Sequence, residues 1–287
     1  MPSLRESIDD RLTIPSQHYD TMPSLRESQR NDNNGTYTNI RLPKDLQPTQ
    51  YNVLLELDLN STFNFSGTVD IFFICVKATK RIILHSKKLN ITYFSLHEIT
   101  RNDVTTRRIT VVRMSKNENN SHIVFETDDF LHANGKKCIL TITFNGMLAT
   151  DNLGFYKQSY KTKSGQTRYF AAGVFGLWNA RKAFPCFDEP EFKAKFRLTI
   201  KHDKGLQAVS NMPIQRRIVI DDHPVESIFE NTPKMSTYLL QFLISDFSSF
   251  EGKTTSGTKV CCRPYSPHRL PRLGVIDKLV KLENDLS

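Results

Sequence analysis

Apolar and polar residues alternate over much of the chain, and the alternation begins close to residue 50. Residues 53–59 carry valine or leucine at every second position, which is the period of a half-buried β-strand. Residues 67–75 begin with a glycine and again place an apolar residue at every second position. The opposite face of this second run is partly apolar too, so we expect this strand to be covered on both sides.

Similar short runs continue toward the C-terminus, and turn residues separate most of them. Many short strands with almost no helical periodicity predict a mainly β fold, an antiparallel β-sandwich or saddle-like assembly of sheets. Helical spacing appears only in residues 273–286, which predicts a short C-terminal helix. The further expected strands are 81–85, 108–114, 122–126, 137–144, 196–201, 207–211, 218–220, 227–230, 237–244 and 259–263.

The same pattern divides the chain into three regions. Residues 1–39 are polar and contain the heptapeptide MPSLRES twice, so we expect a disordered tail, because two short copies cannot build a repeat architecture. Residues 40–268 are expected to form the β domain. Residues 269–287 are expected to begin a helix.

The net charge of +9 would suit a polyanionic partner. The basic residues occur in small groups, such as Lys80 with Arg81, and acids or apolar strands separate these groups. This distribution favours an ordinary solvated surface and no nucleic-acid partner. The longest apolar stretch, residues 71–76, is far shorter than the roughly 20 residues of a membrane-spanning helix, so we expect no membrane span. The sequence leaves the oligomeric state open.

Cysteines and glycosylation sequons bear on the compartment. The cysteines form no CxxC pair, and we expect mostly buried free thiols at Cys75, Cys138, Cys186, Cys261 and Cys262. Sequons occur only in the first 121 residues, which suggests an extracellular or plasma-membrane protein. The opening residues lack the apolar core of a secretory signal, so the chain as written would be cytoplasmic, and the two observations conflict. The sequon asparagines are Asn34, Asn60, Asn64, Asn90 and Asn119.

The most informative segment reads NARKAFPCFDEP and spans residues 179–190. Pro185 and Pro190 fix two backbone angles and bias the preceding residues toward extended geometry. The segment is therefore expected to be a constrained loop that leads into the strand at 196–201. Three apolar side chains are expected to hold the loop against the core: Phe184, Cys186 and Phe187.

Asp188 and Glu189 place two carboxylates side by side in this segment. A catalytic acid/base pair is one interpretation. Adjacent residues in an extended loop point apart, however, and an aspartate before a turn usually accepts backbone hydrogen bonds or pairs with an arginine. We favour the structural role, with Arg181 as the partner.

At these residues the chain resembles the aminopeptidase N family of zinc metallopeptidases, whose N-terminal domain carries the segment A-R-x-A-F-P-C-F-D-E-P. The resemblance covers roughly residues 41–287 and implies an N-terminal β domain followed by the first helix toward a catalytic domain that this sequence does not contain. The family removes N-terminal residues from peptides with the help of zinc. Other matching segments are residues 41–43 with Tyr51, 65–69, 154–156, 237–247 and 263–264.

The residues that the family uses for catalysis are absent from this sequence. The family holds zinc with two histidines of HExxH and a distant glutamate, and a GxMEN loop helps to hold the free amine of the peptide. The only His-Glu pair, His97 with Glu98, has Arg101 where the second histidine would stand and lies in an expected strand or loop. We therefore expect no catalytic residue, no metal ligand and no cofactor in this chain, and zinc only where a longer product supplies a catalytic domain.

One departure lies inside the matched region. The family usually reads T-Q-F-E-P-T-D-A-R where residues 173–181 read GVFGLWNAR. By resemblance, the glutamine and glutamate of that segment contact the amino end of the substrate. Here these positions are Val174 and Gly176, whose side chains offer no acceptor for an ammonium group. Trp178 is expected in the core or in the wall of the cleft.

Two functions follow from this reading. The first is an aminopeptidase N-like N-terminal domain that lacks the zinc site and is inactive alone. The alternative is a stand-alone, non-catalytic module that binds peptides or another protein. Peptides are the expected partners in both cases.

Overall fold

The computed structural model describes residues 39–262, apart from residues 60, 100–105, 163, 177, 222, 248–249 and 254–258. For residues 106, 250–253 and 259–262 only the backbone is described. The expected tail, except for residue 39, and the expected C-terminal helix lie outside the described residues. Strands dominate the described part, which confirms the mainly β prediction.

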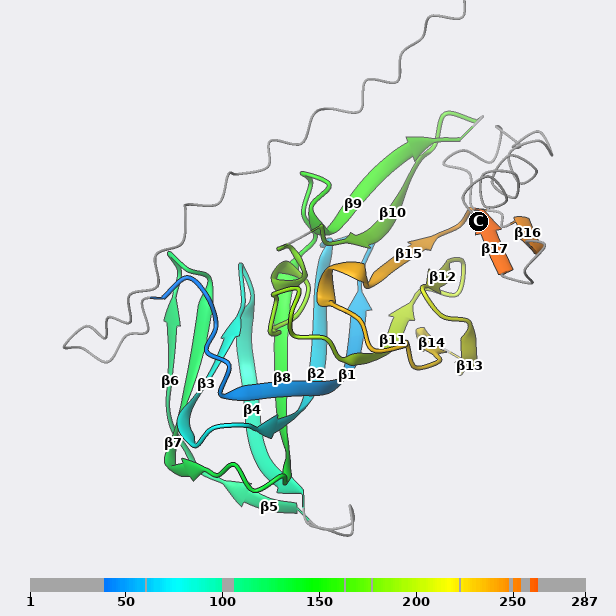
Figure 1. Cartoon of the computed structure of the whole chain (residues 1–287). Helices are drawn as coiled ribbons and strands as arrows, with labels where there is room; N and C mark the ends of the chain where they lie inside the picture. Colours follow the sequence, from blue (N-terminus) through cyan, green and yellow to red (C-terminus); the bar gives the residue numbers. More distant parts are fainter. Residues whose placement is uncertain are drawn as a thin grey trace, which may run out of the picture.

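The strands of the described part form four sheets (Figure 1). The largest has the order β13 (Ile214–Ile218), β14 (Val225–Phe229), β11 (Lys195–His202), β1 (Leu46–Leu57), β2 (Asn64–Cys75), β8 (Lys137–Met147), β4 (Asn90–Ile99) and β5 (Thr106–Ile109). A smaller sheet has the order β3 (Thr79–His85), β7 (His122–Leu131) and β6 (Val111–Asn117). Another has the order β12 (Gln207–Ser210), β15 (Gln241–Ser245), β10 (Thr167–Val174) and β9 (Gly154–Lys161), and β16 (Phe250–Lys253) pairs with β17 (Lys259–Cys262).

The alternation in the sequence determines which face of each strand is buried. In β2, fully buried positions alternate with half-buried ones, so the inner face lies in the core and the outer face is only partly covered. Gly67 stands where β2 passes close to its neighbours, because a Cβ there would lie 2.7 Å from the Leu54 carbonyl and from the Phe144 ring. A larger side chain at Gly67 would force β1 and β8 apart.

Pairing in the large sheet is antiparallel except at its centre. There β1 runs parallel to β11, with Tyr51 beside Phe196, and these two rings stack with centroids 4.9 Å apart. The sheet is therefore mixed, with this one parallel pair among antiparallel strands. The parallel pair joins the start of the domain to the strand that follows the NARKAFPCFDEP segment.

Several strand boundaries differ from those expected. The expected strand 108–114 is divided between β5 and β6, which belong to different sheets. The expected strand 237–244 begins instead with a 3-10 turn, η2 (Thr237–Leu239), and only β15 is extended. The expectation at 218–220 was wrong, because β13 ends at Ile218. Strands β4, β9, β10 and β16 were not expected.

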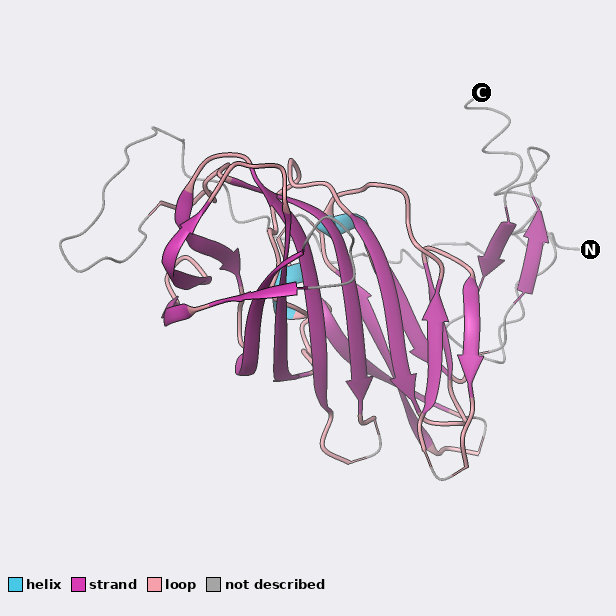
Figure 2. Ribbon diagram, turned by 90° about the horizontal axis from the view of Figure 1, so that it is seen from below, coloured by secondary structure: helices cyan, strands magenta, loops and turns pink. Residues whose placement is uncertain are grey.

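The core lies between the sheets and is continuous over most of the domain. Phe94 of β4 packs edge-on against Phe125 of β7, and Phe65 of β2 packs edge-on against Phe155 of β9. The sheet of β3, β7 and β6 and the sheet of β12, β15, β10 and β9 thus both pack against the large one. Figure 2 shows the long strands side by side, with the two single-turn helices near the middle of the molecule.

Candidate functional site

The NARKAFPCFDEP segment lies at the junction of the sheets. It begins with the 3-10 turn η1 (Ala180–Lys182) and is buried continuously from residue 183 to residue 189. The backbone of Cys186 exchanges two hydrogen bonds with His85 at the end of β3, with N to O distances of 2.8 and 3.1 Å. The segment therefore connects the small β3 sheet to the start of β11.

Asp188 is fully buried and all of its polar contacts come from the protein. Its Oδ2 accepts hydrogen bonds from the Arg181 Nε at 2.9 Å and from the Arg181 backbone N–H at 3.2 Å. Its Oδ1 accepts one from the Thr237 hydroxyl at 2.7 Å, and Arg181 Nη2 donates to the Asp188 carbonyl at 3.0 Å. This many donors hold the buried carboxylate in one position.

Glu189 points to a different set of partners. Its Oε1 accepts a hydrogen bond from the Leu42 backbone N–H at 2.8 Å, and its Oε2 lies 3.2 Å from Arg41 Nε. Burial raises the pKa of Glu189, while the Leu42 N–H and the Arg41 guanidinium act in the opposite direction. Because the two carboxylates diverge, they do not form an acid/base pair. Arg41 was not expected as the partner of Glu189, although residues 41–43 belong to the segments that match the family.

Residues 183–187 of the segment fill the core. Phe184 and Phe187 are buried, and the Phe187 N–H donates to the Tyr51 hydroxyl at 3.2 Å. Burial raises the pKa of the Cys186 thiol well above its usual value, which keeps it protonated and a poor nucleophile. Pro185 is buried, and the carbonyl of Pro190 accepts a hydrogen bond from the Ser236 hydroxyl at 2.6 Å.

Cys75 and Cys138 are also buried free thiols, whereas the side chains of Cys261 and Cys262 lie outside the described part.

Val174 and Gly176 stand just before this segment. Val174 ends β10 and is 40% exposed, and Gly176 is exposed with φ of 51°, in the left-handed region that favours glycine. Neither position offers a side-chain acceptor. Gln241 of β15 is the register partner of Val174 and is exposed, so it places one amide beside this edge. Trp178 is half-buried.

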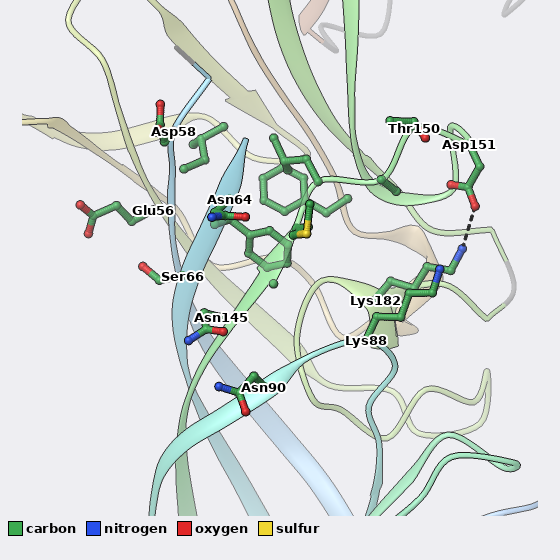
Figure 3. Close-up of a pocket in the computed structure, with 17 residues that line it drawn as sticks. Glu56, Asp58, Asn64, Ser66, Lys88, Asn90, Asn145, Thr150, Asp151 and Lys182 are labelled. Carbon is green, nitrogen blue, oxygen red and sulfur yellow. Dashed lines mark hydrogen bonds and ion pairs between the residues drawn. The ribbon is translucent and has the colours of Figure 1, made fainter. Parts of the chain in front are cut away.

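A groove with both polar and apolar lining residues lies next to η1, at the end of the large sheet (Figure 3). Its volume is about 1050 Å³. Lys182 of η1 forms part of the wall of this groove, and its Nζ lies 3.4 Å from the Asp151 Oδ2. Gly154 allows this approach, because a Cβ there would lie 2.8 Å from the Lys182 Cβ. The groove is lined by the ends of strands that are distant in the sequence. Local sequence patterns therefore did not predict it.

The zinc chemistry of the family does not fit the described residues. Within the described ranges, no group of three or more His, Cys, Asp or Glu side chains converges as a metal site would require. His97 and Glu98 lie in β4, and Glu98 is paired with Lys136 at 2.6 Å. The strand placement of this pair agrees with the sequence reading.

Three of the sequon asparagines lie within the described residues. Asn64, Asn90 and Asn119 are exposed, and the first two line the groove. Asn34 and Asn60 lie outside the described residues. No helix among the described residues is both long enough and apolar enough to cross a membrane.

The mixed β fold and the buried Arg181–Asp188 segment define an aminopeptidase N-terminal β domain. A family model described as the peptidase M1 N-terminal domain matches residues 47–239, and the chain belongs to this family.

The chain is also similar to curated aminopeptidases. It is 34% identical over 264 residues to endoplasmic reticulum aminopeptidase 1 of Rattus norvegicus, covering 91% of this chain and 28% of that protein. It is 37% identical over 223 residues to endoplasmic reticulum aminopeptidase 2 of Bos taurus, covering 77% and 23%. It is 34% identical over 238 residues to aminopeptidase N of Canis lupus familiaris, covering 79% and 24%. The chain spans about a quarter of the length of these relatives.

Proposed function

We propose that this chain serves as the substrate-side β domain of an aminopeptidase and does not itself hydrolyse peptides. The observation that carries the proposal is the intact Arg181–Asp188 scaffold in a chain without the HExxH and GxMEN segments. The scaffold fixes the edge that carries Val174 and Gly176, so the domain can form one wall of a peptide cleft. Zinc-bound water and its general base would have to come from another domain.

The altered edge limits what this wall contributes to recognition. An ammonium group needs carboxylate or carbonyl acceptors, and the side chains of Val174 and Gly176 supply none. Gln241 offers a single neutral amide beside Val174. We infer that this edge binds a peptide amine weakly and that apolar contact with Val174 dominates.

The second candidate function is a non-catalytic peptide-binding module. The groove beside Lys182 favours it, because its volume of about 1050 Å³ is large enough for a small ligand. Both candidate functions use the same β domain. They differ only in whether a catalytic domain acts together with it.

For the compartment, we propose the secretory pathway or the cell exterior. Relatives are named as endoplasmic reticulum aminopeptidases and, in one case, as an ectoenzyme, and three sequon asparagines are exposed. The cytoplasmic location expected from the opening residues has no support from these relatives.

An aminoacyl chromogenic assay of the purified chain tests the proposed function. We expect no release of chromophore with or without added zinc. Release that depends on zinc and increases with the amount of this chain would contradict it.

A further inference from the structure

The floor of the groove is a straight row of polar side chains from four adjacent strands. Glu56 of β1 is the register partner of Ser66 in β2, Ser66 is the partner of Asn145 in β8, and Asn145 is the partner of Asn90 in β4. Partners in a sheet point to the same face, and all four residues are exposed. No hydrogen bond from any of these four side chains to another described residue is recorded in the structure.

The two ends of the row carry opposite charge (Figure 3). Glu56 and Asp58 lie at one end. Lys88 and Lys182 lie at the other, where the Lys87 N–H donates to the Arg181 carbonyl at 2.9 Å and so joins the two backbones. Lys182 is paired with Asp151, whereas Lys88 has no ion-pair partner among the described residues.

We propose that this groove binds a short peptide with both termini free. Its amino group would lie at Glu56 and its carboxylate at Lys88, while the asparagine amides would bond to the peptide backbone between them. The proposal rests on the proposed function only in that the ligand is a peptide. The groove does not include Val174 or Gly176.

The dimensions of the row fit a peptide of this kind. Neighbouring strands lie about 4.8 Å apart, so three gaps place Glu56 roughly 14 Å from Asn90. An extended peptide advances about 3.4 Å per residue, which corresponds to about four residues. Asparagine amides carry both a donor and an acceptor, so each can bond to a peptide unit.

Other ligand chemistries fit less well. A sugar ring usually stacks on an exposed aromatic face, but the rings that line the groove, Phe65 and Phe155, are buried. A phosphate needs several unpaired cations, and the groove provides Lys88 beside the already paired Lys182. A zwitterionic chain uses both charged ends.

Tetra-alanine with free termini is the probe that tests the proposal. The full chain, prepared without N-glycans and labelled with ¹⁵N, is titrated with tetra-alanine, with its N-acetylated form and with its C-amidated form. We expect the side-chain amide signals of Asn90 and Asn145 to shift, and each capped form to bind about two- to fivefold more weakly, because each cap removes one ion pair.

Two variants assign the ends of the groove. Glu56→Gln should abolish the preference for a free amine, and Lys88→Gln should abolish the preference for a free carboxylate. Both side chains are exposed, so folding should be preserved. Glu118→Gln and Lys77→Met change exposed charges outside the groove and should leave both preferences unchanged.

Equal affinity for free and capped peptides would overturn the proposal, as would shifts of these amides by a high-mannose oligosaccharide but not by tetra-alanine. Either result would leave the proposed function standing, since that function is decided by turnover and not by binding in this groove.

Discussion

His85 and His122 face each other in the core as register partners of β3 and β7, with ring centroids 4.9 Å apart. His85 also shares backbone hydrogen bonds with Cys186, so the pair lies directly behind the NARKAFPCFDEP segment. Burial lowers the pKa of both histidines, and the positive charge of Arg181 lowers it further; for His122 the pKa falls to about 4. Arg41 and His122 act in the same direction on His85.

The domain should therefore lose stability as the pH falls. The unfolded histidines bind protons below about pH 6.5, whereas the folded ones stay neutral, so the unfolded state takes up more protons between about pH 6.5 and 4. Each histidine contributes up to about 1.4 kcal/mol per pH unit in that window. Urea unfolding at several pH values measures this slope. Glu189, whose pKa is raised, contributes with the opposite sign, so the native chain must be compared with a variant.

His122→Gln removes one of the titrating groups and should flatten the slope between pH 6.5 and 4. His132→Gln changes an exposed histidine and should leave the slope as in the native chain. A slope unchanged by His122→Gln would contradict the assignment.

Removal of the Arg181 guanidinium should destabilise the domain, because Asp188 is fully buried. Arg181→Ala leaves this carboxylate with the Thr237 hydroxyl and a backbone N–H, and we expect the free energy of unfolding to fall by about 3 kcal/mol. Chemical denaturation measures the change. The exposed Arg108→Ala should change stability by less than about 0.5 kcal/mol. Equal effects of the two variants would show that the buried pair is unimportant.

Some of the exposed sequons should be glycosylated when a secretory signal is added to the chain. Asn64, Asn90 and Asn119 are exposed, and treatment with an N-glycosidase should lower the mass of the secreted protein. Asparagine-to-glutamine changes at these positions and at Asn34 and Asn60 should remove the effect. An unchanged mass after glycosidase treatment of the native sequence would argue against a secretory origin.

Purified chain should hold no stoichiometric zinc. The described histidines and buried thiols do not converge, and a tight zinc site needs three or four ligands at one point. Elemental analysis after dialysis against a chelator measures the content. About one zinc retained per chain would overturn this expectation.

The alternation of apolar residues was sufficient to predict β1, β2 and β8, because one face of each is buried in the core. It failed for β4, whose residues are mostly exposed or half-buried, since a strand with little buried surface leaves no clear period. The hairpin of β9 and β10 was missed for the same reason over its polar half.

Long-range pairing was beyond the reach of local patterns. The β1–β11 pair joins Gln50 to Lys195, and only the folded sheet shows that it is parallel. The pairing of Arg181 with an acid of its own segment was within reach, because these residues are close in sequence. The polar row from Glu56 to Asn90 could not be predicted from the sequence, since it depends on the register of four strands.

The central claim, that this chain is a β domain without peptidase chemistry of its own, is tested most directly by turnover. Contaminating peptidases are first removed by ion-exchange chromatography. The purified chain is then incubated with leucyl and alanyl chromogenic substrates, with and without zinc. We expect a rate equal to that of buffer, because the sequence has no HExxH segment and the Cys186 thiol is buried and protonated. A zinc-dependent rate that is proportional to the concentration of this chain would contradict it.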